Sequence, residues 1–240
     1  MRPVRRNSSP FHQGVRDYRE ALPLLVSRPG SYCERRISTN LHVEYIQPKD
    51  LPQHRNLVNQ WNNFLLACVN CNSTKGTKDP GLAGMYLPDR DNTFVAFAYL
   101  QDGSVSPTKG TALHRHMAEE TLALTGLDKR GRDSIDENGK LVALDRFKQR
   151  METWMIALES RQDIQSNPNN EAVRKWVLRT AEERGFFSIW MAVFDGDLDM
   201  RNRLIDAFPG TRGSGCFDPV TTDPVRPGPN PDALQDGGKV

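Results

Sequence analysis

Residues 33–76 read CERRISTNLHVEYIQPKDLPQHRNLVNQWNNFLLACVNCNSTKG, and they hold three of the four cysteines and two of the five histidines of the sequence. Residues 41–46 alternate between apolar and polar side chains, a pattern that predicts a strand. The short apolar run at 63–67 predicts a second strand, and residues 72–76 predict the start of a short helix. This stretch therefore predicts a strand–strand–helix unit that organises the rest of the chain.

The flanking sequence predicts a mostly helical body. Residues 1–14 are basic and polar, and we expect them to lie on the surface, ahead of a short helix over 15–22. Beyond the central stretch, an aromatic strand is predicted at 94–100, followed by a hairpin turn at Asp102-Gly103. Helices are predicted over 111–125, 139–162, 171–184 and 199–208, with a buried apolar segment at 186–193. Residues 217–240 are rich in Pro and Gly, which predicts a disordered tail.

The 240 residues have a net charge of +2, and this small value hides an asymmetry. Residues 1–80 carry 12 Lys and Arg against 6 Asp and Glu, whereas the remainder carries 20 against 24. A basic first third suits a phosphate-bearing partner, although a solvated basic face would look the same. No apolar run is long enough for a membrane span, and the start lacks the apolar segment of a secretory signal. No phosphate-binding GxxxxGK[ST] run occurs, so any ATP dependence would come from a partner.

Two of the cysteines, Cys68 and Cys71, form a CxxC pair among polar residues. Such a pair, in a chain with four cysteines, is typical of a metal-binding knuckle in a reducing compartment and not of a disulfide framework. The sequence therefore predicts a cytoplasmic protein.

Three segments together carry a family resemblance: VEYIQPK at 43–49, WNNFLLAC at 61–68 and CNSTKG at 71–76. They closely resemble HNH endonucleases, and in particular the stand-alone HNH proteins of Septu and retron-type anti-phage systems, which are usually encoded beside an ATPase of the ABC or SMC type. The resemblance implies an α+β fold with a small ββα-metal core embedded in a mostly helical domain. It divides the chain into a basic arm and short helix (1–29), the HNH core (30–80), a hairpin plus helical body (81–210) and a tail (211–240).

The resemblance also implies a function, namely metal-dependent cleavage of DNA together with an ATPase subunit. Glu44 and Asn72 offer hard oxygen donors to one catalytic Mg²⁺ or Mn²⁺ ion. By the resemblance, Asn63 orients the loop and the general base. Lys49 and Lys75 would contact phosphates that flank the cut, an interaction without sequence information.

One position departs from the family, because Tyr45 stands where HNH enzymes place the catalytic His. A phenol with a pKa of about 10 is ionised to only roughly one part in a thousand at neutral pH, and loss of a general base costs on the order of 10²- to 10⁴-fold. Three alternatives remain open. Tyr45 itself, or His42, which lies two residues before Glu44 and on the same face of the strand, could replace the base. The chain could instead be an inactive scaffold that binds DNA or a partner, with Tyr45 completing an apolar strand face. Tyr45 could also be a substitution introduced to trap an inactive state.

The second departure concerns a structural Zn²⁺ ion. Relatives generally carry two CxxC pairs, whereas here Cys33 has Gly30 three residues before it and only Cys68 and Cys71 form a pair. A tetrahedral structural site needs four ligands. His54 or the distant Cys216 could complete it, or the three thiols could be packed without metal.

Overall fold

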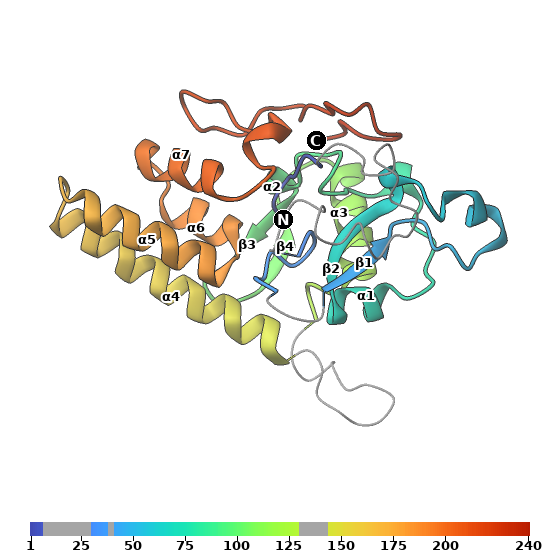
Figure 1. Ribbon diagram of the computed structural model, residues 1–240, viewed down its shortest axis with the longest axis horizontal. Coiled ribbons are helices and arrows are strands. Elements are labelled where there is room, and N and C mark those ends of the chain that lie inside the picture. Colours follow the sequence, from blue (N-terminus) through green and yellow to red (C-terminus); the bar gives the residue numbers. More distant parts are fainter. Residues whose placement is uncertain (7–29, 38–40, 130–143) are drawn as a thin grey trace.

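The computed structural model describes residues 1–6, 30–37, 41–129 and 144–240, and it has the predicted α+β class (Figure 1). The strands are β1 (Leu41–Tyr45), β2 (Phe64–Cys68), β3 (Phe97–Tyr99) and β4 (Val105–Pro107). The helices are α1 (Val69–Lys75), α2 (Thr93–Ala96), α3 (Ala112–Thr125), α4 (Leu144–Ser166), α5 (Glu171–Arg184), α6 (Phe187–Val193) and α7 (Leu198–Ala207).

The predicted strand–strand–helix unit is formed by β1, β2 and α1. The two strands pair antiparallel, with Glu44 opposite Leu65 and Tyr45 opposite Phe64. All five residues of β2 are buried, as its continuous apolar sequence requires. The helix α1 begins directly after β2, and the Cys68 sulfur accepts a hydrogen bond from the Cys71 amide in its first turn. This abrupt change from strand to helix places the residues of α1 beside the end of β1.

Helices α4 to α7 form a body at the opposite end of the molecule, whereas α3 lies beside α1. Figure 1 shows α4, α5, α6 and α7 gathered away from β1, β2 and α1, with the β3–β4 hairpin between them. One hydrophobic core nevertheless runs through both parts. It includes Leu65 and Ala67 of β2 as well as Phe187 and Trp190 of α6. The strand–strand–helix unit is therefore packed into the body and shares its core.

A backbone junction joins the two parts. Arg35 forms an isolated antiparallel bridge with Gly185, and the amide of Phe186 donates to the carbonyl of Glu34 at 2.7 Å. The buried Glu34 carboxylate accepts from the amide and the hydroxyl of Ser188, at 2.7 and 2.6 Å. Glu34 and Phe186 both have a positive φ, 59° and 57°. Unusual backbone on both sides thus allows a close approach between the loop before β1 and the start of α6.

Both ends of the chain differ from the sequence-based expectation. Met1 and Arg2 are buried, although we expected a surface arm. The C-terminal segment, expected to be disordered, instead has specific partners. The Asn92 side chain donates to the carbonyls of Cys216 and Val225, and the amide of Gly228 donates to the carbonyl of Val240. The acceptors in these three hydrogen bonds are main-chain carbonyls, and a high content of Pro and Gly does not remove carbonyl groups.

Individual elements also shift relative to the sequence-based expectation. The residues expected to begin an aromatic strand form the short helix α2 before β3, and the long helix expected over 139–162 is described from Leu144 to Ser166. The helix expected at 15–22 lies outside the described residues. Within the described part of the chain, no helix is both long and apolar enough to cross a membrane.

Gly185 should be the glycine least tolerant of substitution at the junction. It has a φ of +75°, and a Cβ there would lie 2.4 Å from the Glu34 carbonyl oxygen and 2.6 Å from the Arg36 amide nitrogen. Backbone atoms cannot move aside cheaply, so Gly185→Ala should lower the free energy of unfolding by about 2–5 kcal/mol. Gly84→Ala is the matched control, because a Cβ at Gly84 has no neighbour within 4 Å. Urea unfolding measures both, and equal stability of the two variants would contradict the close approach.

Candidate functional site

A pocket of about 340 Å³ lies where the end of β1, the loop after it and α1 meet. It is lined by His42, Val43, Glu44, Tyr45, Pro48, Lys49, Asp50, Asn72, Lys75, Gly76 and Thr77. Every residue proposed from sequence for catalysis, for the catalytic metal or for phosphate binding, except Asn63, is in this set, whereas the three cysteines proposed for zinc are not. The pocket is therefore the candidate active site.

Glu44 is a buried carboxylate with a cation beside it. Its side chain leaves β1 next to Lys75 of α1, and Lys75 Nζ lies 2.7 Å from Glu44 Oε1. Both side chains are 2% exposed. Burial raises the pKa of Glu44 to about 7, while the charge of Lys75 and its hydrogen bond act in the opposite direction. Lys75 Nζ also donates to the carbonyl of Tyr45 at 2.7 Å, so this ammonium fastens α1 to the end of β1.

Lys75 therefore differs from the sequence-based expectation that it contacts phosphate. Its ammonium is turned into the protein, toward the Glu44 carboxylate and the Tyr45 carbonyl. Asn72, three residues earlier on α1, is half-buried and lines the same pocket. Residues three apart on a helix share a face, so Lys75 also fixes where Asn72 stands relative to Glu44.

Tyr45 and His42 occupy different environments. The Tyr45 ring packs edge-on against Phe64, with centroids 5.2 Å apart, and Lys49 Nζ lies 5.0 Å from the centre of the same ring. Val43 packs against the same small apolar cluster as Tyr45. His42 is exposed at the pocket. The structure thus gives Tyr45 a packing role on one strand face and leaves His42 facing solvent.

Asn63 holds the loop that follows β1. Its Oδ1 accepts from the amide of Gln47 at 2.8 Å, and its Nδ2 donates to the Gln47 carbonyl at 2.9 Å. The amide of Ile46 also donates to the Asn63 carbonyl at 2.9 Å. Asn63 is buried and absent from the pocket lining, so it shapes the wall of the pocket from behind.

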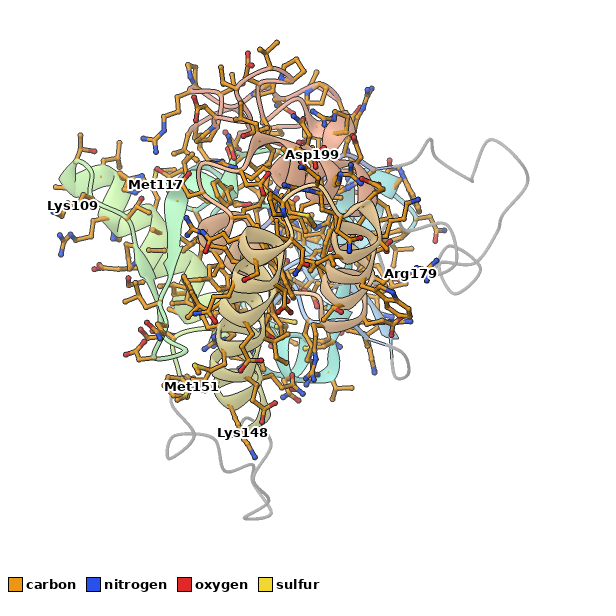
Figure 2. All side chains as sticks on the ribbon, turned by 90° about the vertical axis from the view of Figure 1, so that its left-hand side faces the viewer. Lys109, Met117, Lys148, Met151, Arg179 and Asp199 are labelled. Carbon is orange, nitrogen blue, oxygen red and sulfur yellow. The ribbon has the colours of Figure 1, made fainter. Side chains whose placement is uncertain are left out.

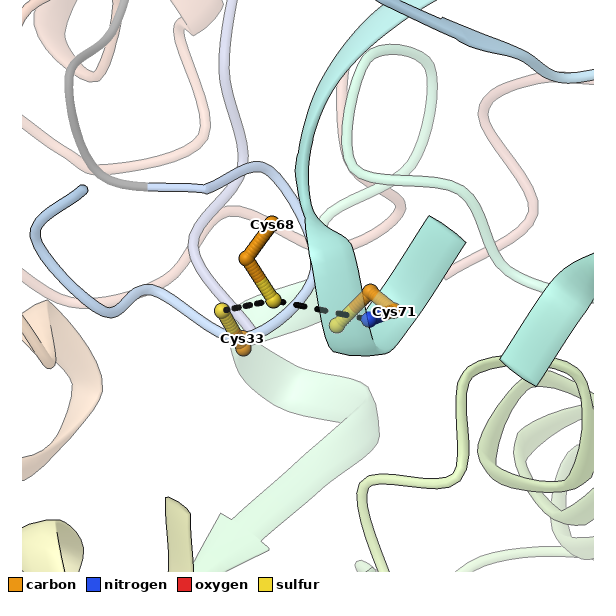
Figure 3. A group of neighbouring side chains, drawn as sticks. All are labelled: Cys33, Cys68 and Cys71. Atoms are coloured by element: carbon orange, nitrogen blue, oxygen red, sulfur yellow. Dashed lines mark hydrogen bonds between the residues drawn. The ribbon is translucent and has the colours of Figure 1, made fainter. Parts of the chain in front are cut away.

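Behind the pocket, three cysteines converge from separate elements (Figure 3). The sulfur atoms of Cys33, Cys68 and Cys71 all lie within 4.8 Å of one another, and all three side chains are buried. Cys33 Sγ is 3.7 Å from Cys68 Sγ. Hydrogen bonds from the other two thiols lower the pKa of Cys68, and hydrogen bonds within the cluster raise the pKa values of Cys33 and Cys71. Three buried thiols with their sulfur atoms this close offer the soft ligands that a thiophilic cation prefers.

Neither residue considered as a fourth ligand joins the cluster. His54 Nε2 instead contacts the carboxylate of Asp79 at 2.8 Å, and Cys216 Sγ contacts the Ser214 carbonyl at 3.8 Å. Among the described residues, the cluster contains the three cysteines alone. Gly30 borders it, because a Cβ at that position would lie 3.2 Å from Cys33 Sγ.

Sequence reasoning missed one further residue at the cluster. Arg146 of α4 donates from Nη1 to Cys71 Sγ at 3.3 Å and is buried. It stands 75 residues after Cys71, and no motif or spacing in the sequence connects the two.

Gly30→Cys should supply the missing fourth thiolate. The backbone at Gly30 is outside the positive-φ region, and the closest obstacle to a Cβ is the Ile37 Cδ1 atom at 2.9 Å, the end of a flexible side chain. A four-cysteine set completes the tetrahedral geometry that Zn²⁺ prefers, so we expect zinc affinity to rise at least about tenfold, or 1.4 kcal/mol. Competition with a chromophoric chelator measures it. Gly30→Ala is the control. Equal zinc affinities of the two variants would contradict the placement of Gly30 beside the cysteine cluster.

Lys75→Met should destabilise the protein in a pH-dependent manner. The folded pKa of Glu44 lies above its usual 4.5, so ionisation of Glu44 weakens the fold as pH rises through the range up to about 7. Without Lys75 this pKa should rise further and extend the weakening to higher pH. We expect a loss on the order of 3 kcal/mol at about pH 8.5 and a smaller loss at about pH 6. Urea unfolding at both pH values measures these losses. Lys49→Met is the control, and its loss of unfolding free energy should be similar at the two pH values.

One comparison with known protein families finds a match in this part of the chain. The model of the HNH endonuclease family matches residues 31–78, which include β1, β2, α1 and all three clustered cysteines. No curated protein matches the chain. The match covers a minority of the 240 residues and stops before the helical body. The chain therefore contains an HNH endonuclease domain, formed by residues 31–78.

Proposed function

We propose that the protein is a metal-dependent endonuclease that cleaves phosphodiester bonds of DNA. The observation that carries the proposal is the pocket at the family-matched residues, which brings His42, Glu44, Tyr45 and Asn72 together from β1 and α1. A carboxylate, an amide and an imidazole around one open pocket are the donor types that divalent-metal phosphodiester hydrolysis needs.

The donor set fits a hard divalent cation such as Mg²⁺ or Mn²⁺. Glu44 and Asn72 offer oxygen ligands at the pocket wall, while Glu44 Oε1 is sealed from solvent against Lys75. The second carboxylate oxygen is the one we assign to the ion. When bound, the ion stabilises the negative charge that develops on the phosphate and the leaving oxygen. Lys75 holds Glu44 in place from behind, as partners of metal-binding carboxylates commonly do.

His42 is the side chain that we assign as general base. An imidazole takes up a proton near neutral pH, and His42 is exposed at the pocket, where a water molecule has access. Tyr45 is committed to packing on Phe64. Asn63 positions the loop after β1 through its two hydrogen bonds with Gln47, and Lys49 is the pocket lysine that we assign to phosphate binding.

We also propose that the thiol cluster holds a structural Zn²⁺ ion. Three buried sulfur atoms within 4.8 Å fit such an ion in donor type and in spacing. The cluster joins the loop at Cys33 to β2 and α1. A metal there would stabilise the strand–strand–helix unit from behind and leave the catalytic pocket open.

The wider role is proposed from the sequence resemblance. Residues 43–49, 61–68 and 71–76 resemble stand-alone HNH proteins of Septu and retron-type systems. We propose accordingly that the protein is the nuclease component of a bacterial anti-phage system, that it acts in the cytoplasm, and that an ABC- or SMC-type ATPase is its partner.

A second candidate function is an inactive HNH scaffold that binds DNA or a partner without cutting. Two observations favour it. Tyr45 stands at the position of the family's catalytic His and is packed against Phe64, and the Glu44 carboxylate already has a buried cation in Lys75. The scaffold would keep the fold of the pocket while lacking its chemistry.

Plasmid cleavage in Mg²⁺ or Mn²⁺, with the chain alone and with the ATPase encoded beside it, distinguishes these functions. We expect cleavage by this chain, a loss of about 10²- to 10⁴-fold in His42→Ala, and a comparable loss in Asn72→Ala. His116→Ala is the matched control, because His116 is an exposed histidine on α3 away from the pocket. Its activity should be unchanged.

Tyr45→His separates the remaining outcomes. If the chain binds DNA but never cuts, and Tyr45→His cuts, the protein is an HNH scaffold switched off at one position. If neither cuts while both bind, the enzyme proposal is wrong for this pocket. If both cut at similar rates, Tyr45 has no part in catalysis and His42 remains the base.

A further inference from the structure

Arg146 is the only described residue outside the family-matched segment for which a hydrogen bond to a clustered sulfur is found. The residue as a whole is 3% exposed. Nη1 donates to Cys71 Sγ at 3.3 Å and to the Thr125 carbonyl at 3.2 Å, and Nη2 donates to the Gly126 carbonyl at 2.9 Å. A guanidinium keeps its charge in a protein, so the cluster has a permanent cation at its edge.

The charge of Arg146 would balance the charge of a metal ion bound by three thiolates. Three thiolates around a divalent ion leave one net negative charge, and a buried charge without a partner is costly. Arg146 supplies the matching positive charge through a direct hydrogen bond to one of the sulfurs. We propose that Arg146 is an outer-sphere partner of a thiophilic divalent ion held by Cys33, Cys68 and Cys71, and that this contact ties α4 to the metal site. The inference rests on the proposed occupancy of the cluster by metal.

The surroundings of Arg146 explain how one contact links several elements. Gly126 ends α3, and a Cβ there would lie 2.9 Å from the Thr74 side chain of α1, so α1 and the end of α3 are in close contact. Arg146 lies in the first turn of α4 and reaches both. Lys148, two residues later, points away from the body of the molecule (Figure 2). The inner side of this turn therefore belongs to the metal site and the outer side to solvent.

A purely structural role for Arg146 is the alternative, because it also satisfies two backbone carbonyls. Arg150, one turn later, is the matched control. It is buried to 1% exposure and donates to the carbonyls of Gly103 and Leu127 at 2.6 and 3.1 Å. Its charge also acts on Cys33 and Cys71, but no hydrogen bond from it to sulfur is found. If only burial and carbonyl binding matter, the two arginines are equivalent. If contact with the thiolate matters, they are not.

The test uses the full chain and measures metal affinity in place of activity. Zn²⁺ affinity by chelator competition, and the thiolate-to-metal absorption band of the Co²⁺ form, are compared for wild type, Arg146→Gln, Arg146→Lys and Arg150→Gln. We expect Arg146→Gln to weaken binding about 10- to 100-fold, Arg146→Lys to lose less because it keeps the charge, and Arg150→Gln to change affinity at most a few-fold. The Co²⁺ band should keep its three-thiolate intensity throughout, because no ligand is removed.

Two results with the variants overturn the proposal. The first is an equal metal affinity of wild type and Arg146→Gln. The second is an equal loss of affinity in Arg146→Gln and Arg150→Gln. A wild-type chain that binds neither Zn²⁺ nor Co²⁺ refutes the metal assignment itself, whereas normal metal binding without DNA cleavage leaves the inference standing and refutes only the nuclease function.

A second measurement requires no variant. It tests whether α4 is tied to the metal site even if Arg146→Gln does not fold. In the wild-type protein, removal of Zn²⁺ should speed amide hydrogen exchange in the first turns of α4 more than in its last turns. Equal exchange with and without metal along the whole of α4 would show that the helix is not tied to the site.

Discussion

The sulfur atoms of Cys33, Cys68 and Cys71 converge to within 4.8 Å, and this convergence constrains the fold around them. Cys33 belongs to the loop before β1, Cys68 ends β2, and Cys71 lies in the first turn of α1. Bringing the three together fixes the turn between β2 and α1, and with it the side of α1 that faces β1. None of the three cysteines lines the candidate pocket, but Asn72 and Lys75 of the same helix do, so the geometry of the pocket depends on the cluster.

At the pocket, the buried carboxylate of Glu44 and the aromatic ring of Tyr45 determine which chemistry the site can perform. Glu44 would be costly to bury alone, and Lys75 offsets that cost while also binding the Tyr45 carbonyl. The arrangement keeps Glu44 fixed whether or not the protein cuts DNA. Tyr45, by contrast, contributes ordinary packing against Phe64, at the position where the sequence resemblance leads one to expect a catalytic base. The packing that shapes the pocket therefore does not depend on exposed side chains such as His42.

Local patterns could be predicted from sequence, and long-range partnerships could not. The alternation at 41–46 and the cysteine pair at Cys68 and Cys71 depend on neighbours in the chain, so the strand–strand–helix unit and the gathering of site residues followed from them. The inward turn of Lys75 and the contact between Arg146 and Cys71 depend on what lies across the fold. Composition misled for the C-terminal segment, because Pro and Gly content says nothing about partners such as Asn92.

The junction at Gly185 bears on how such a protein can evolve. The family-matched residues end at 78, yet Glu34 and Arg35 are held by backbone and side-chain groups at 185–188, and the β2 side chains share their core with α6. A segment with these dependencies is not an autonomous folding module. Grafted alone onto another protein, it would expose one side of its core. Recombination between relatives would therefore have to exchange the nuclease segment and the matching part of the helical body together.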